Sequence, residues 1–337
     1  MQSIQNRRRF LTSLTAAGAA GLVGRSTPSW AEPPPETATV RLPVFYKISD
    51  CQLPEYIATE LLRAEGFTDI QFVASGTGPD SPDWLAHGEL DFDWPFLPAA
   101  IRSIDSGAPI KVLAGMHSGC LELIADKSIR SVLQLKGRRV GIDITNGTPH
   151  ELLIIMAAYV GLDPFNDIHW VANPDLSPLE LLAQGKIDAF LGIPPLPQEA
   201  RGRKLGHVIL NTSIDHPWSQ YYCCMLTSTA DYVNRYPVAT KRVLRALLKA
   251  VDLCVSDPER VARLAVERGF ASRYDYALQA MRDVRYDAWR DYDAEDSMRF
   301  YALRMQETGI TKASPQKIIA AGTDWSFLNE IKRELKT

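Results

Sequence analysis

The sequence predicts an α/β fold built from two similar lobes. Three observations support this: a short unit occurs twice, strand-like and helix-like segments alternate up to about residue 228, and the rest of the chain is almost entirely helical. The unit reads Leu-Ala-His-Gly-Glu-Leu-Asp-Phe at residues 85–92 and Leu-Ala-Gln-Gly-Lys-Ile-Asp-Ala at residues 182–189. Each copy is typical of a last helical turn, a closing glycine and a short strand, because glycine tolerates the left-handed conformation just past a helix end.

Residues 1–31 have the pattern of an export signal and not of a folded element. Three arginines at residues 7–9 precede Phe10 and an uncharged, small and apolar stretch, and Ser29-Trp30-Ala31 offers small residues for cleavage. Paired arginines indicate the twin-arginine route, so we expect a periplasmic protein. The stretch is short and rich in glycine and alanine for a membrane span, so we expect no membrane insertion after cleavage. An uncleaved N-terminal anchor is the alternative.

Charge and cysteine content exclude some classes of function. Residues 1–31 hold four arginines and no acid, which leaves 33 basic and 40 acidic residues in the rest of the chain. This balance argues against nucleic acid or an anionic membrane as a partner. Five cysteines are too few for a disulfide scaffold. One bridge, Cys51 with Cys120, is a candidate, and small buried thiols are the alternative.

The first series of elements runs from residue 39 to about residue 115. Strands are expected at 39–46, 70–73, 90–93 and 110–115, and helices at 54–65, before the first repeat, and at 97–106. Gly66 ends the first helix, and Ser81-Pro82 has a capping residue followed by proline at the first helical position. This alternation predicts a largely parallel sheet covered by helices.

A second series begins near Leu135. Strands are expected at 139–144, 168–171, 187–191 and 208–210. Thr148 and Ser177 each stand three positions before a glutamate, which predicts capping boxes at the starts of two helices.

The chain after residue 228 is expected to return to the first lobe. Helices at 238–255, 258–269, 294–308 and 325–335 have no strands of their own to cover, so they should pack on the first sheet. The chain would then cross between lobes near residues 121–128 and 221–228, and two crossovers make a hinge. We therefore assign residues 38–124 and 225–337 to lobe 1 and residues 125–224 to lobe 2.

This order of elements resembles the periplasmic solute-binding proteins of ABC importers, which have a two-lobed type II fold with two hinge crossovers. It is similar in particular to the nitrate/sulfonate/taurine group, which includes thiamine-precursor binders. The resemblance covers about residues 39–330. It rests on the repeated Leu-Ala-x-Gly-x-hydrophobic-Asp, on the export signal and on Ser-Val-Leu-Gln-Leu-Lys-Gly-Arg-Arg-Val-Gly at residues 131–141. It implies a monomer that binds a small molecule and docks on an ABC permease and ATPase, without catalysis, cofactor or metal.

The ligand should lie where the strands end, because open α/β sheets bind ligands beyond the carboxyl ends of their strands. Residues 75–78 and 146–149 offer small side chains and backbone N–H groups for an oxyanion, although a simple turn and a helix cap are the alternatives. The residues expected to contact the ligand are Tyr46, Ser49, Asp50, Ser75, Thr77, Asp93, Trp94, His117, Thr145, Asn146, Thr148, Trp218 and Tyr221.

Acidic and aromatic side chains dominate these strand ends, where Lys47 is the one basic residue. A zwitterion, an amine or a neutral heterocycle therefore fits better than nitrate. The two candidate solutes are an aliphatic sulfonate such as taurine and an aminopyrimidine-like thiamine precursor. One rival is an enzyme on the same fold, similar to the yeast-type pyrimidine synthases, although Cys223-Cys224 is too short to match their cysteine motif. The other is a ligand sensor that docks on a membrane partner.

His117 and Cys120 could supply two zinc ligands, or a base and a nucleophile. No second matched pair of zinc ligands is apparent in the sequence. We therefore expect His117 to contact the ligand and expect no metal.

Overall fold

The computed structural model describes residues 32–44, 49–74 and 83–335. The predicted export signal at residues 1–31 lies outside the described residues. Residues 35–337 form one unit, and all that follows concerns this unit. No helix among the described residues is both long and apolar enough to cross a membrane.

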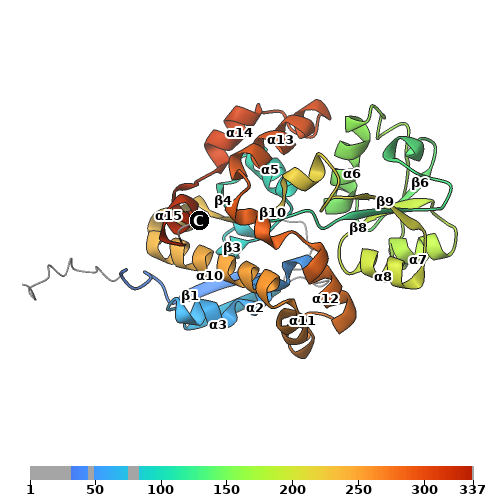
Figure 1. Ribbon diagram of the computed structural model, residues 1–337. Helices are drawn as coiled ribbons and strands as arrows, with labels where there is room; N and C mark the ends of the chain where they lie inside the picture. Colours follow the sequence, from blue (N-terminus) through green and yellow to red (C-terminus); the bar gives the residue numbers. More distant parts are fainter. Residues whose placement is uncertain (1–31, 45–48, 75–82, 336–337) are drawn as a thin grey trace, which may run out of the picture. The chain divides into compact units, whose positions relative to one another are not determined.

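Three β-sheets organise this unit (Figure 1). The first is a parallel pair, and the second is a three-stranded antiparallel sheet in the order β3-β10-β4. The third is a mixed sheet in the order β7-β6-β8-β5-β9, which lies on the right in Figure 1. The strands are β1 (Thr39–Val44), β2 (Asp69–Ala74), β3 (Phe92–Asp93), β4 (Ile110–Ser118), β5 (Glu122–Ala125), β6 (Arg139–Ile142), β7 (His169–Ala172), β8 (Ala189–Gly192), β9 (His207–Asn211) and β10 (Tyr222–Thr229).

The α/β class is confirmed, but the expectation of largely parallel sheets is wrong for β5 and β10. Both strands run antiparallel to their neighbours. These two strands occupy most of residues 121–128 and 221–228, where the sequence predicted that the chain crosses between the lobes. The actual links are residues 119–121 and 212–221. Antiparallel strands need no crossover helix, so β5 and β10 can begin directly after these short links.

Helices cover the sheets, and those after β10 return to the first-lobe elements as expected. Helix α10 contacts α2, α3 and β4, α13 contacts α5, and α14 and α15 contact β4. The predicted helix at 54–65 is two helices, α2 and α3. The helices are α2 (Leu53–Ile57), α3 (Thr59–Ala64), α4 (Asp83–Ala86), α5 (Leu97–Asp105), α6 (Thr148–Tyr159), α7 (Pro178–Ala183), α8 (Leu196–Arg203), α9 (Ala230–Arg235), α10 (Pro237–Ser256), α11 (Pro258–Glu267), α12 (Tyr274–Asp283), α13 (Ala294–Glu307), α14 (Pro315–Gly322) and α15 (Ser326–Leu335), with 3-10 turns η1 (Asp50–Gln52), η2 (Val132–Leu135), η3 (Trp218–Gln220) and η4 (Tyr286–Arg290).

Of the two predicted capping boxes, only the Ser177 cap is confirmed, since the carboxylate of Glu180 pairs with Arg203. The Ser177 hydroxyl accepts a hydrogen bond from the backbone N–H of Glu180 at the start of α7. Thr148 is not a cap: α6 is preceded by Gly147 and has no side-chain cap. Glu151 instead pairs with Arg102 of α5, so the carboxylate is not available to complete a box.

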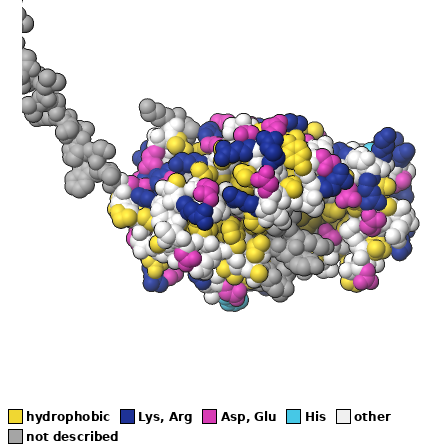
Figure 2. Space-filling model, turned by 90° about the horizontal axis from the view of Figure 1, so that it is seen from below, with side chains coloured by type: hydrophobic (Ala, Val, Ile, Leu, Met, Phe, Trp, Pro, Cys, Tyr) yellow, Lys and Arg dark blue, Asp and Glu magenta, His cyan; other side chains and the backbone are white. Residues whose placement is uncertain are grey.

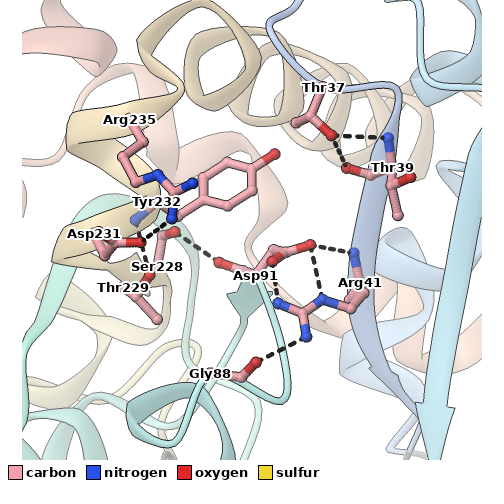
Figure 3. A network of polar contacts seen from close by, with 10 residues as sticks. All are labelled: Thr37, Thr39, Arg41, Gly88, Asp91, Ser228, Thr229, Asp231, Tyr232 and Arg235. Atoms are coloured by element: carbon pink, nitrogen blue, oxygen red, sulfur yellow. Dashed lines mark hydrogen bonds and ion pairs between the residues drawn. The ribbon is translucent and has the colours of Figure 1, made fainter.

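The aspartate of the repeated unit makes the same contact in both copies. In the first copy Asp91 accepts hydrogen bonds from the backbone N–H of Arg41 on β1 (2.8 Å) and from its guanidinium (2.6 Å), as Figure 3 shows. In the second copy Asp188 accepts the same two bonds from Arg139 on β6, also at 2.8 and 2.6 Å. The backbone N–H of each aspartate returns a bond to the carbonyl of its arginine. The repeat therefore ties each new strand to its neighbour.

The link from β4 to β5 is held by a glycine and a threonine. Gly119 has φ +53°, and a Cβ there would lie 2.4 Å from the Thr212 carbonyl oxygen. The Thr212 hydroxyl accepts hydrogen bonds from the backbone N–H groups of Cys120 (3.0 Å) and Leu121 (2.9 Å). These contacts fix where Cys120 leaves β4.

We expect Asp91→Asn to destabilise the protein more than Asp188→Asn. The side chain of Asp91 is 9% exposed and that of Asp188 is 21% exposed. Water therefore compensates the loss of the ion pair with arginine less well at Asp91. The expected losses in the free energy of unfolding are about 1–3 kcal/mol for Asp91 and under about 1 kcal/mol for Asp188. Urea unfolding measures both, and an equal or larger loss at Asp188 would contradict the ranking.

Thr212→Val should destabilise the protein, whereas Thr212→Ser should be nearly neutral. Valine has the shape of threonine but leaves the N–H groups of Cys120 and Leu121 without their acceptor. The expected loss is about 2–4 kcal/mol, since an unsatisfied buried donor costs about 1–3 kcal/mol. Serine keeps the hydroxyl and serves as the matched control in the same unfolding measurement. Equal stabilities of the two variants would show that the hydroxyl does not hold this link.

Candidate functional site

Four cysteines and a histidine meet where the strands of the first lobe end. Cys51 lies in η1, just after β1, and His117 and Cys120 lie at and just beyond the end of β4. Cys223 and Cys224 lie on β10. All five side chains are buried. We call Cys51, His117, Cys120, Cys223 and Cys224 the thiol cluster.

Strand pairing and turn geometry bring the thiol cluster together. Cys224 pairs with His117 across β10 and β4, so their side chains share one face of the sheet. The ligand atoms of Cys51, His117 and Cys120 all lie within 4.8 Å of one another. The Sγ atoms of Cys120 and Cys223 are 3.3 Å apart, and those of Cys223 and Cys224 are 3.9 Å apart.

The cysteines are free thiols, so the candidate bridge between Cys51 and Cys120 is not formed. The Sγ contact of 3.3 Å between Cys120 and Cys223 is also too long for a disulfide, whose sulfur atoms are about 2.05 Å apart. The alternative reading, small buried thiols, matches the structure. Cys254 on α10 lies outside the cluster, and its thiol contacts the carbonyl of Ala250 within the same helix.

His117 is the most polar group of the cluster and is fully buried. Neither of its ring nitrogens has a well-formed hydrogen bond among the described residues. Burial lowers the pKa of His117, but the neighbouring thiols of Cys224 and Cys51 outweigh burial and raise the pKa to about 10. The pKa of Cys224 is lowered in turn, chiefly by its hydrogen bond with Cys120. The thiols therefore favour a positively charged group at this place.

Acidic side chains surround the thiol cluster. Glu55 on α2 is fully buried, and neither of its carboxyl oxygens has a hydrogen-bond partner among the described residues. Burial, Asp93 and Cys224 raise its pKa well above the usual value. Burial and the adjacent Cys51 raise the pKa of Asp50 to about 7. Neither Asp50 nor Glu55 pairs with a basic side chain in the part of the chain that the structure describes.

Aromatic rings and one carbonyl complete the surroundings. The rings of Trp94 and Tyr286 lie 6.0 and 5.5 Å from the imidazole of His117, centroid to centroid. The Tyr286 hydroxyl donates to the carbonyl of Cys51 at 2.9 Å. The carbonyl of Pro194, just after β8 of the five-stranded sheet, accepts bonds from the backbone N–H of Asp50 and the hydroxyl of Ser49. Elements of both lobes therefore meet at this place.

The predicted ligand contacts separate into three groups. Ser49, Asp50, Asp93, Trp94 and His117 lie together around the thiol cluster. Tyr46, Ser75 and Thr77 lie outside the described residues.

The third group lies elsewhere in the fold. Trp218 packs edge-on against Tyr159 and Phe300, and Tyr221 stacks on Phe300 with centroids 3.8 Å apart. Both are therefore held in an aromatic group with α6 and α13. Thr145 and Asn146 are exposed, and Thr148 is buried in the first turn of α6.

The start of α6 is partly engaged in contacts of its own, which disfavours an oxyanion site there. Asn146 adopts φ +62°, and its backbone N–H donates to Nδ1 of His150 at 2.9 Å. Glu151 adds a buried carboxylate in the same turn, which Arg102 compensates. A negative ligand would compete with both groups.

Surface cavities lined by described residues lie elsewhere. One of about 460 Å³ includes Arg41, Asp91 and Tyr232, next to the network in Figure 3. Another of about 560 Å³ includes Tyr221, Arg285 and Tyr292. On the face seen in Figure 2, Lys and Arg side chains are interspersed with Asp and Glu. Neither cavity contains a member of the thiol cluster.

Sequence reasoning missed the cysteines and Glu55 as site residues. A signal for the cysteines was present in the segments expected at the strand ends. Cys51 and Cys120 are the last residues of two of these segments, and Cys223 directly follows a third. No local signal marks Glu55, which is an ordinary first-turn acid of α2.

Solved structures with the same fold include binding proteins of importers. The nitrate-binding protein NrtA from Synechocystis PCC 6803 has a TM-score of 0.74 at 16% identity, with 90% of each chain covered. The alkanesulfonate-binding protein SsuA from Xanthomonas axonopodis pv. citri, solved with MOPS, has a TM-score of 0.66 at 18% identity over 88% of this chain and 100% of that one. The aliphatic sulphonate binding protein SsuA from Escherichia coli has a TM-score of 0.65 at 18% identity, over 84% and 92%.

These likenesses confirm the periplasmic-binding-protein fold that the sequence predicted. No curated protein matches the sequence significantly. Residues 34–268, well over half of the chain, match the NMT1-like family. The chain therefore belongs to the NMT1-like family.

Proposed function

We propose that this protein is the substrate-binding component of an ABC importer, exported to the periplasm by the twin-arginine route. It binds a small organic solute between its lobes as a monomer and delivers it to a permease and ATPase. The fold supports this role, since proteins of this shape close on a ligand by hinge motion. The sequence predicts lobes of residues 38–124 with 225–337 and of residues 125–224, and the sheet pairing supports placing the boundaries slightly earlier, in the links at 119–121 and 212–221.

The observation that carries the choice of solute is the pair of buried acids, Asp50 and Glu55, beside His117. A buried carboxyl group that lacks a basic partner favours its neutral form, as the raised pKa values of both residues reflect. A protonated Glu55 can donate a hydrogen bond, and an ionised one attracts a cation. Neither form supplies a positive charge for an anion. Of the two solute classes, the aminopyrimidine-like one therefore fits better than a sulfonate.

An aminopyrimidine also matches the remaining groups. Its exocyclic amine can donate to a carboxylate, and its ring nitrogens can accept from a protonated acid. Trp94 and Tyr286 provide rings against which a planar heterocycle can pack. A taurine-like solute has an ammonium group for the acids but needs a donor set for its sulfonate.

A thermal-shift screen of the full chain tests this proposal. We expect aminopyrimidines to stabilise the protein and nitrate and alkanesulfonates to leave it unchanged. A ligand at a hundred times its Kd adds about 2.7 kcal/mol to the free energy of unfolding. Glu55→Gln should abolish the shift while the protein stays folded, and Glu259→Gln, on the surface of α11, should keep it. A shift with sulfonates alone would contradict the assignment.

The thiol cluster favours one alternative, an enzyme on the same fold. A cysteine nucleophile beside His117 would alter the solute or become modified itself. We propose binding without covalent chemistry, so the masses of protein and solute should be unchanged after prolonged incubation. A modified cysteine or a converted solute, seen by mass spectrometry, would favour the enzyme.

A further inference from the structure

The thiol cluster combines two features that organic-solute binding does not require. It brings four thiols and one imidazole together in a fully buried place, and its histidine lacks a well-formed hydrogen bond among the described residues. A buried imidazole nitrogen normally has a partner, because burying an unsatisfied polar atom costs free energy. A group that binds both sulfur and nitrogen would satisfy the whole set.

We propose that Cys51, His117 and Cys120 bind one thiophilic d¹⁰ metal ion, Zn²⁺ or Cu⁺, with Cys224 at the fourth position. The inference concerns the same cleft as the proposed solute but does not depend on that solute. Thiolate and imidazole are the ligands that such ions prefer, whereas Mg²⁺ and Ca²⁺ take oxygen ligands.

The ligand atoms lie close enough together to reach one tetrahedral ion. With Zn–S bonds of about 2.3 Å and Zn–N bonds of about 2.0 Å, the ligand atoms of one zinc ion lie roughly 3.3–3.8 Å apart. The atoms of Cys51, His117 and Cys120 lie within 4.8 Å of one another, so small side-chain movements bring them onto one ion. Cys224 pairs with His117 in the sheet and shares its face, which places its thiol next to the same point.

Strand pairing and hydrogen bonds hold the backbone around the site. His117 is held in the β4–β10 pairing, Cys120 by the Thr212 hydroxyl, and the carbonyl of Cys51 by Tyr286. Ligands on a fixed backbone lose little entropy when they bind an ion.

Cys223 has a different expected role. Its Sγ lies 3.3 Å from that of Cys120. Thiol–disulfide exchange with an added small-molecule disulfide would join the two sulfurs and release that reagent as two thiols. An oxidised Cys120 cannot bind the metal. Oxidation and metal binding therefore compete for one sulfur, and the number of free thiols tells them apart.

Metal titration of the reduced, metal-free full chain tests the proposal. We expect one equivalent of Zn²⁺ or Cu⁺ per chain, measured by native mass spectrometry and by competition with a chelating dye in separate titrations for the two ions. Co²⁺ should give thiolate-to-metal charge-transfer absorption in the wild type. Cys120→Ser and His117→Gln should each weaken binding by at least about tenfold to a hundredfold.

Cys254→Ser is the matched control, because Cys254 is a buried cysteine outside the cluster. It should keep the full stoichiometry, affinity and Co²⁺ spectrum. Circular dichroism and thermal unfolding without metal establish whether each variant is folded. If the cluster variants do not fold, the wild-type Co²⁺ spectrum and stoichiometry decide.

Several results would overturn the proposal. They are the absence of a bound equivalent in the wild type, a Co²⁺ spectrum without thiolate bands, and equal affinity in Cys254→Ser and Cys120→Ser. A purified protein that has three free thiols and binds metal only after reduction would contain a disulfide. This result would overturn the metal site for the protein as purified. If no solute stabilises the protein but metal binds, the proposed solute is wrong and the metal site stands. If a solute binds but no metal does, the metal site is wrong and the proposed solute stands.

Discussion

The antiparallel pairing of β4 with β10 is the interaction on which the rest of this structure depends. These strands come from distant parts of the chain, and each leads directly into the link to the five-stranded sheet. The pairing therefore fixes the hinge and the site together. Gly115 shows how close the approach is: a Cβ there would lie 2.4 Å from the ring of Tyr222. A side chain larger than hydrogen would separate the strands and move His117 away from Cys224.

The two lobes share a scaffold contact but not a binding chemistry. Asp91 and Asp188 hold Arg41 and Arg139 with the same set of backbone and side-chain bonds. This explains why the repeat ends in aspartate in both copies, since the carboxylate joins one strand to the next. The chemistry differs beyond the strands that follow. The first lobe presents Asp93 and Trp94, and the second presents the carbonyl of Pro194.

Both proposals rest on one electrostatic fact, the excess of acids and thiols over basic groups at the described strand ends. An uncompensated buried carboxylate costs several kcal/mol. The protein therefore keeps such a group protonated or supplies a positive charge. A heterocycle with an amino group and a thiophilic cation both meet this requirement, and nitrate does not. Solved relatives named for nitrate and sulfonate share the fold, but at 16–18% identity their ligands need not carry over.

The sequence by itself determined the α/β class, the two similar lobes and most elements, because these depend on local signals such as Ser177 before Glu180 and the glycine after each repeated helix. It also placed Ser49, Asp50, Asp93, Trp94 and His117 at strand ends, where they lie together. Only the tertiary structure decided that 122–125 and 222–229 are antiparallel strands, because an apolar run does not reveal its partner. For the same reason, only the fold showed that Cys51, Cys120 and Cys224 lie beside one imidazole and that Cys223 contacts Cys120. Residues so far apart in sequence meet through strand register, which long-range backbone pairing sets and no local pattern records.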